Sequence, residues 1–174
     1  MKKDIFIVLT QTGSIVSAGI KLAKKKEYNH ASLAMDVSLE PMYSFGRRHP
    51  YNPFWGGFVE EHIHSGTFKR FPKTRCSVYR AAVEESQYAA IEELLARMLL
   101  EKERYKFNVR GLMTAAFDKY KKRENYYYCS EFVRRVLEEA GVDVSAVPEA
   151  VHPEYLTALS DEKPIYTGLL REYR

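Results

Sequence analysis

The residues best suited to chemistry are a cysteine at the start of one periodic segment and a histidine at the start of another. Cys129 follows the aromatic run Tyr126–Tyr128, and apolar residues recur after it at helical spacing until Gly141, which is typical of a left-handed C-terminal cap. The pattern predicts a helix with Cys129 in its first turn. There, unpaired backbone N–H groups and the helix dipole favour the thiolate. The alternative is a buried cysteine that serves only as a small hydrophobe.

Histidine is the side chain whose pKa best suits proton exchange with such a thiol. His30 begins a segment in which polar and apolar residues alternate up to Val37, which predicts a strand with His30 on its more polar face. A strand can hold an imidazole about 3 Å from a sulfur more firmly than a loop can. We therefore favour His30 as the base, although a histidine on a strand often serves only the structure. The other candidates are His49, His62, His64 and His152.

A rival reading places a metal ion on a different segment. Glu60, His62 and His64 alternate along another predicted strand, and a carboxylate with two imidazoles could bind Zn²⁺. The rise of a strand spreads the outer two over about 13 Å, which is wide for one ion. We interpret the three as an exposed polar face and expect no metal and no cofactor.

The elements that position these residues can be read from the remaining pattern. Leu39–Pro41 favour a turn and Met42–Phe45 the returning strand of a hairpin, on which Ser44 is the polar residue expected nearest His30. Gly46–Gly57 indicates a long loop, either a substrate lip or a loop packed on the core. The other expected elements are strands at Ile5–Leu9, Phe58–Ile63, Ser77–Val83 and Ile165–Leu169, and helices at Gly13–Lys25, Glu84–Lys102, Val109–Tyr120 and Glu154–Leu159.

This order of elements is mixed and largely antiparallel. It favours an α+β fold in which an antiparallel sheet packs against the helix that carries Cys129. No Gly/Ser-rich or Pro-rich linker divides the 174 residues, so we predict a single domain over residues 1–174.

Composition limits the class of protein. The content of 45% hydrophobic and 13% aromatic residues indicates a folded chain, and two cysteines exclude a disulfide framework. The first apolar run ends at Leu9, too early for a signal peptide, so we expect a cytoplasmic protein. The net charge of +4 comes mostly from Lys24–Lys26 and Lys119–Arg123, which we interpret as solvated surface. An anionic membrane surface would suit these runs but is not indicated, and no nucleic-acid-binding motif occurs.

Two segments resemble a known family of enzymes. Asn29–Leu33 and, far downstream, Tyr128–Val133 resemble the circularly permuted papain-like amidases. These form the YiiX-like branch of the NlpC cysteine peptidase superfamily, which also includes lecithin:retinol acyltransferase. In this branch the histidine strand precedes the cysteine helix, as here. Tyr105–Asn108 is similar to an aromatic element of the same family.

The resemblance implies a role for each site residue. Cys129 would be the nucleophile, His30 the general base, and a polar residue on the next strand would orient the imidazole. That third place is usually His or Glu, and the nearest equivalent here is Ser44, with Tyr43 and Glu40 as open alternatives. Glu131 matches the Cys-Ser-Glu pattern of the family, and we expect it to favour the helix dipole. The oxyanion would meet the backbone N–H of Cys129, aided by the loop at residues 11–14.

Together these observations predict a cysteine hydrolase or acyl transferase that acts on an amide or ester through an acyl-enzyme. The resemblance implies a small-molecule, cell-wall peptide or acyl-lipid substrate and leaves the choice among them open. The alternative function is a catalytically silent papain-like domain that binds a peptide or lipid ligand.

Overall fold

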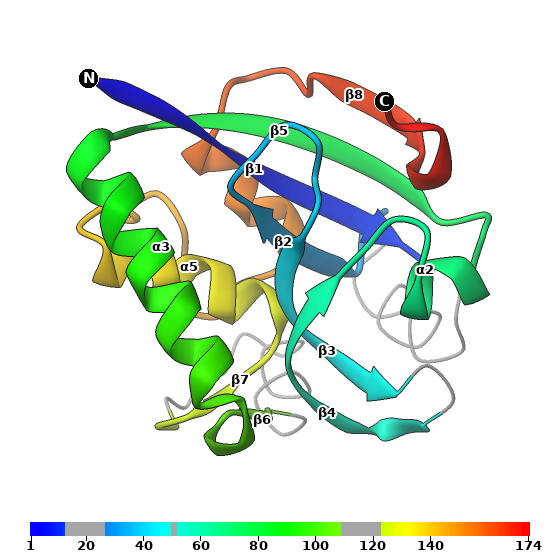
Figure 1. Ribbon diagram of the computed structural model, residues 1–174. Coiled ribbons are helices and arrows are strands. Elements are labelled where there is room, and N and C mark those ends of the chain that lie inside the picture. The colour runs from blue at the N-terminus through cyan, green and yellow to red at the C-terminus, as the bar shows by residue number, and fades with distance from the viewer. Residues whose placement is uncertain (13–26, 50–51, 109–122) are drawn as a thin grey trace.

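The fold is organised around one open sheet (Figure 1). The computed structural model describes residues 1–12, 27–49, 52–108 and 123–174. Within them, eight strands are arranged in the order β7-β6-β4-β3-β2-β1-β5-β8, and all neighbours are antiparallel except β6 and β7. The strands are β1 (Lys2–Gln11), β2 (His30–Ala34), β3 (Met42–His49), β4 (Asn52–Glu61), β5 (Arg75–Glu84), β6 (Lys106–Phe107), β7 (Tyr126–Tyr127) and β8 (Tyr166–Leu169).

Helices cover the sheet on its two faces. The larger hydrophobic core lies between the sheet and the helices α3 and α5, which pack on one face (Figure 1). A smaller core on the other face includes Phe68 of α2 and Leu170 of η3. The described helices are α2 (Gly66–Arg70), α3 (Glu85–Leu100), α5 (Cys129–Glu139) and the 3₁₀ segments η1 (Lys102–Arg104), η2 (Pro153–Leu159) and η3 (Leu170–Glu172).

The central strand β1 shows why this sequence builds a two-sided sheet. Its apolar residues alternate between the cores: Ile5 and Ile7 belong to the larger one, and Phe6 and Val8 to the smaller. A strand buried on both faces reads as a continuous apolar run. This strand pairs with β2 and places Thr10 opposite His30. The core strand therefore fixes the position of the histidine.

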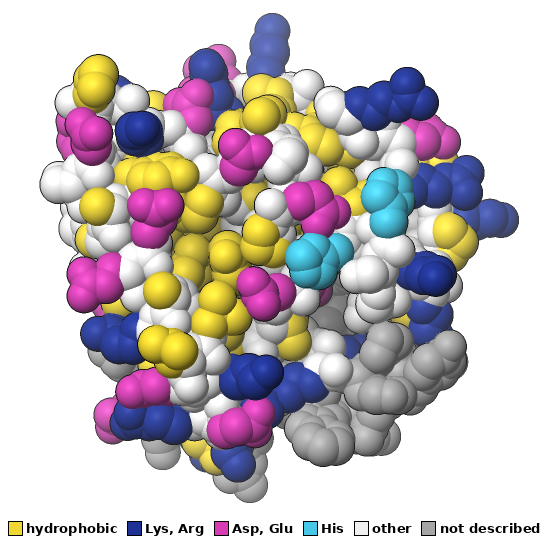
Figure 2. All heavy atoms as spheres, viewed as in Figure 1, with side chains coloured by type: hydrophobic (Ala, Val, Ile, Leu, Met, Phe, Trp, Pro, Cys, Tyr) yellow, Lys and Arg dark blue, Asp and Glu magenta, His cyan; other side chains and the backbone are white. Residues whose placement is uncertain are grey.

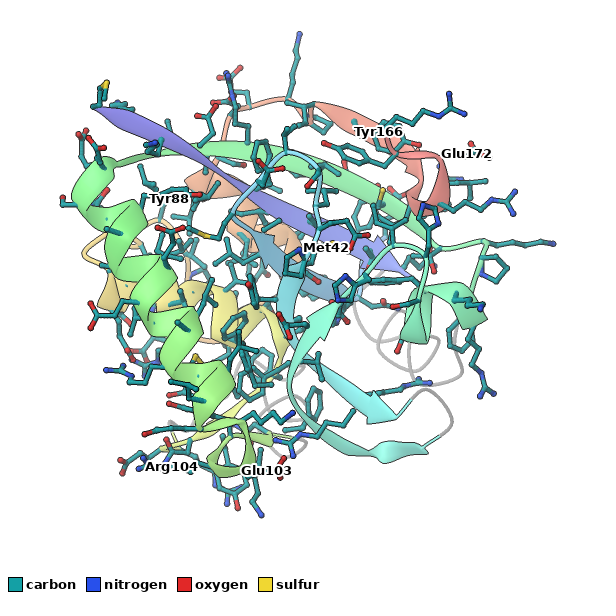
Figure 3. All side chains as sticks on the ribbon, viewed as in Figure 1. Met42, Tyr88, Glu103, Arg104, Tyr166 and Glu172 are labelled. Carbon is teal, nitrogen blue, oxygen red and sulfur yellow. The ribbon has the colours of Figure 1, made fainter. Side chains whose placement is uncertain are left out.

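Helix α3 is fixed at its start and along its length. The side-chain oxygen of Gln87 accepts a hydrogen bond from the backbone N–H of Glu84, which satisfies one donor before the first turn. Tyr88 points from α3 toward the sheet (Figure 3), and its hydroxyl donates to the carbonyl of Met35 at 2.9 Å. Ile91 and Leu95 are buried in the larger core. Thus α3 is the scaffold helix that its apolar periodicity predicts.

The α+β class expected from the sequence is confirmed, and so are the helix that begins at Cys129 and the strand that begins at His30. Gly141, just after α5, has a φ of 80°, as a left-handed cap requires. The sequence pattern predicts no helix at Gly66–Arg70, where the structure has α2. The expected helices at Gly13–Lys25 and Val109–Tyr120 lie outside the described residues.

The prediction of a long loop over Gly46–Gly57 is wrong. This segment instead continues β3 to His49 and begins β4 at Asn52, with Gly46 paired to Gly57. The glycines serve close packing: a Cβ on Gly57 would lie 2.6 Å from Nε of Arg48 and 2.7 Å from the carbonyl oxygen of Tyr105. A glycine in a strand marks such a close approach as often as it marks a loop.

Among the described residues, no helix combines the length and the apolar character needed to cross a membrane.

Candidate active site

Cys129 is the first residue of α5 and is 4% exposed. The chain reaches it from β7 through Tyr128, which is extended and ends the strand-like path, and the helix starts at the next residue. The carboxylate of Glu131, in the first turn, accepts a hydrogen bond from the backbone N–H of Tyr128 at 3.3 Å. An acid here also favours the helix dipole, as expected. The sulfur is therefore held at the positive end of an eleven-residue helix.

The thiol of Cys129 meets the first residues of β2. It shares a hydrogen bond with the His30 side chain, and backbone N–H groups of Ala31 and Ser130 also reach the sulfur. Because Nε2 of His30 is bound elsewhere, as described below, Nδ1 is the ring nitrogen available to the thiol. The two residues that the sequence singled out for chemistry are thus in direct contact.

The charge state of this pair follows from its surroundings. Burial raises the pKa of a thiol and lowers that of an imidazole, because it disfavours the charged forms. For Cys129, burial is the largest single influence, but the hydrogen bond and charge of His30, together with the backbone hydrogen bonds of Ala31 and Ser130, outweigh it. The pKa of Cys129 therefore lies below the usual value of a thiol. For His30, burial is outweighed by the charge of Glu61 and the hydrogen bonds of Cys129 and Glu61, so its pKa lies well above the ordinary range. Both shifts favour a thiolate–imidazolium ion pair.

Glu61, the last residue of β4, binds the other side of the imidazole. Both carboxylate oxygens lie 3.0 Å from Nε2 of His30, and the carboxylate side chain is only 9% exposed. The buried hydroxyl of Ser32 donates to Oε2 of Glu61 at 2.6 Å. A carboxylate in this place orients the ring and stabilises its protonated form. The site is therefore a chain of three side chains, Cys129, His30 and Glu61, with Ser32 as support.

Glu61 and His30 come from strands that are not neighbours. Strand β3 lies between β4 and β2, so the two side chains meet across it. The residue of β3 at this point is Gly46. A Cβ there would lie 3.2 Å from Oε1 of Glu61 and 3.6 Å from Cε1 of His30. The absence of a side chain at Gly46 leaves the space that the His30–Glu61 contact occupies.

Ser44, the expected orienting residue, has another role. It is fully buried on β3, but its hydroxyl donates to the carbonyl of Ala31 at 2.6 Å, while Glu61 binds the His30 ring. The assignment of Ser44 to the imidazole is therefore wrong. The alternatives Tyr43 and Glu40 are also occupied elsewhere: the Tyr43 ring stacks on Phe58, and Glu40 binds His62 and the backbone N–H of Ile63.

This correction leads to a prediction for Ser44→Ala. The variant loses the buried hydrogen bond to the Ala31 carbonyl, so the free energy of unfolding should fall by about 1–3 kcal/mol. Turnover of a substrate should change less than about threefold, because no group that touches the imidazole is removed. Thermal unfolding and steady-state kinetics measure the two effects. If kcat fell by tens of fold while the melting temperature stayed the same, Ser44 would be the residue that orients the His30 imidazole.

The other histidines with described side chains make contacts of their own. Nδ1 of His62 lies 2.6 Å from Oε2 of Glu40. His64 is exposed. His152 precedes η2, where its Nδ1 accepts from the backbone N–H of Glu154 and its ring meets that of Tyr155. The side chain of His49 lies outside the described residues, as do residues 13 and 14 of the loop expected near the oxyanion.

The two cysteines have different surroundings. Cys76 lies fully buried in β5, within the smaller core, and burial raises its pKa to about 12. A thiol of that kind is unreactive at neutral pH. Over residues 1–12, 27–49, 52–108 and 123–174, no group of three or more His, Cys, Asp or Glu side chains is placed to bind a metal ion.

The face formed by α3 and β4 carries a groove of about 790 Å³ that is separate from this site. Figure 2 views this face and shows acidic and basic side chains interspersed over most of it. Neither Cys129 nor His30 lines the groove. The basic runs Lys24–Lys26 and Lys119–Arg123 lie almost entirely outside the described residues. The groove is lined by Arg48, Phe58, Val59, Glu60, His62, Ala96, Leu99, Leu100, Lys102 and Glu103.

Comparison of the chain with models of protein families, with curated proteins and with solved structures finds no match. Function must therefore be inferred from the residues of the site, since a fold alone does not define an activity.

Proposed function

We propose that this protein is a cysteine hydrolase or acyl transferase with a circularly permuted papain-like fold, acting on an amide or ester through an acyl-enzyme. One observation carries the proposal: the thiol at the start of α5 is bound to His30, whose other nitrogen lies between both oxygens of Glu61. A nucleophile, a base and a group that orients the base, linked in this order, are the parts that acyl transfer requires. The order of His30 before Cys129 in the chain is that of the permuted family.

The geometry supports acylation in a simple sequence of steps. The Cys129 thiolate attacks the carbonyl carbon and forms a C–S bond, while the carbonyl oxygen takes the negative charge. When the tetrahedral intermediate collapses, the bond to the leaving amine or alkoxide breaks. Imidazolium His30 gives its proton to that leaving group, and Glu61 keeps the ring oriented throughout. The result is a thioester on Cys129 and a neutral imidazole.

The acyl group is released in a second step, in which His30 acts as a base and not as an acid. Neutral His30 removes a proton from water, or from another acceptor, as that molecule attacks the thioester carbon. The C–S bond then breaks, Cys129 leaves as the thiolate and His30 is again an imidazolium. Hydrolysis and acyl transfer differ only in the acceptor. The candidate substrates are small-molecule amides or esters, cell-wall peptides and acyl lipids.

Acylation can be tested without knowledge of the natural substrate. p-Nitrophenyl acetate is a general acyl donor, and we expect it to acetylate Cys129 at pH 6–7, a range in which an ordinary thiol is largely protonated. Intact-mass measurement with peptide mapping after acid quench locates the adduct. The variant Cys76→Ala should acetylate as the parent does, and Cys129→Ala should not. If Cys129 shows no adduct while the release of p-nitrophenol matches that of Cys129→Ala, the proposed function is wrong.

A further inference from the structure

We propose that residues 151–154, here called the brace, position Cys129 against His30. The positioning residues are Tyr128, which binds the first residue of the brace, and Glu154, which is its last residue. This inference rests on the proposed function, because it concerns the ion pair that the function requires. Cys129 and His30 lie far apart in the sequence, and a side-chain hydrogen bond between them needs both main chains held to within a fraction of an ångström. The brace contacts the main chain next to each of them.

At its first end, the brace is held by the two neighbours of the nucleophile. The hydroxyl of Tyr128 accepts a hydrogen bond from the backbone N–H of Val151 at 3.0 Å. The hydroxyl of Ser130 donates to the carbonyl of the same residue at 2.8 Å. All three residues are at most 2% exposed. The residues before and after Cys129 therefore hold both peptide groups of Val151, out of contact with water that could replace them.

At its other end, the brace contacts the chain just before His30. Oε1 of Glu154 accepts hydrogen bonds from the backbone N–H groups of Glu27 and Tyr28, at 2.7 and 3.3 Å. Tyr28 is buried in the larger core, and the next backbone N–H, that of Asn29, donates to Thr10 of β1. Three consecutive backbone donors are thus bound immediately before His30. Two of them depend on a single carboxylate.

The segment between the two ends is short and well packed. Pro153 is buried, and the backbone N–H of Tyr155 donates to the carbonyl of His152, which closes the turn after the brace. Leu156, one turn further, is fully buried in the larger core. A buried proline restricts the backbone and removes one donor that would otherwise need a partner. The brace therefore transmits position between the start of α5 and the start of β2.

The test compares variants that break each end with variants that preserve it. Glu154→Ala removes the acceptor for Glu27 and Tyr28, whereas Glu154→Gln keeps an oxygen in the same place without the charge. Tyr128→Phe removes the hydroxyl that accepts from the backbone N–H of Val151 and leaves the carbonyl of Glu149 as the acceptor of that N–H. The matched control is Glu149→Ala, which removes an exposed acid from the same tail. Each protein is checked for folding by thermal unfolding, and iodoacetamide alkylation of Cys129 is then followed from pH 5 to 10 by peptide mapping.

A displaced imidazole no longer stabilises the thiolate, so the pKa of Cys129 rises in the brace variants. We expect Glu154→Ala and Tyr128→Phe to alkylate about tenfold more slowly than the parent at pH 6, as a rise of one pKa unit gives, and within about twofold at pH 10. Glu154→Gln and Glu149→Ala should follow the parent. A loss of stability alone would open the fold more often and speed the alkylation of this buried thiol, so it would not slow alkylation at pH 6.

Two results would overturn the proposal. Parent-like profiles in Tyr128→Phe and in folded Glu154→Ala would show that the brace does not position the pair. A profile of Glu154→Gln equal to that of Glu154→Ala would show that Glu154 acts by its charge and not as an acceptor. If Glu154→Ala does not fold, Tyr128→Phe decides alone. His30→Ala separates this outcome from failure of the proposed function: its profile shifts if only the brace is wrong, and matches the parent if the ion pair itself is absent.

Discussion

Replacing either Cys129 or His30 by alanine should lower turnover by about 10⁴-fold or more, and replacing both should cost little beyond the larger single loss. Cys129 forms the acyl bond, and His30 both stabilises the thiolate and protonates the leaving group. Because the two act as one unit, removal of either leaves the other without a function. Single-turnover kinetics with p-nitrophenyl acetate measure all four proteins against Cys76→Ala, which retains the pair.

Additivity is the result that would contradict this expectation. If the double variant lost the product of the two single losses, Cys129 and His30 would contribute independently, and the hydrogen bond between them would have no part in catalysis. A silent binding domain predicts a third pattern, in which none of the four proteins releases p-nitrophenol faster than free thiol in solution.

The second large effect is expected for Glu61→Gln, which should lower kcat/KM by about 10²- to 10³-fold. A neutral amide stabilises the imidazolium less than a carboxylate 3.0 Å from Nε2 does. The pKa of His30 therefore falls. The thiolate of Cys129 loses part of its cationic partner, and its pKa rises. The acid limb of the profile of kcat/KM against pH should accordingly move to higher pH.

The adjacent residue supplies the control for this variant. Glu60 is exposed, and alternation along β4 points it away from the face that Glu61 occupies. Glu60→Gln makes the same chemical change one position earlier and should leave kcat/KM within about twofold. If the two variants have equal kcat/KM and equal pH profiles, Glu61 does not act on the imidazole.

The sequence predicted Cys129 and His30 because each begins a strongly periodic element. Helical spacing after Cys129 and alternation after His30 define where these side chains lie on their own elements. Their contact did not follow from periodicity alone. The resemblance to permuted amidases added it, and the structure places the two side chains together.

Glu61 was missed because its role depends on strand order and not on local pattern. The sequence indicates a hairpin partner for β2 and so predicts Ser44 on β3 as the orienting residue, but the Ser44 hydroxyl donates to the Ala31 carbonyl. The contact instead reaches across β3 to β4, through the space that Gly46 leaves. One signal was present: alternation puts Glu61 on the face opposite Glu60 and His62, and an acid on an inward face usually has a partner.

The glycines of Gly46–Gly57 misled the assignment for a related reason. Several glycines and prolines in twelve residues are typical of a loop, and local propensity carries no information about what packs against a strand. Here the Arg48 side chain and the carbonyl of Tyr105 pack closely against Gly57, and the His30–Glu61 pair lies next to Gly46. Both positions are dictated by tertiary contacts that lie outside the segment itself.

The central claim is that His30 holds Cys129 as a thiolate, and the pH profile of Cys129 alkylation tests it most directly. In the parent, iodoacetamide should react with Cys129 well below the pKa of a free thiol, about 8.5, while Cys76 stays unreactive. In His30→Ala, the midpoint for Cys129 should rise toward that free value. Superimposable profiles of Cys129 in the parent and in His30→Ala would mean that the two side chains do not interact, and the mechanism proposed for this site would be wrong.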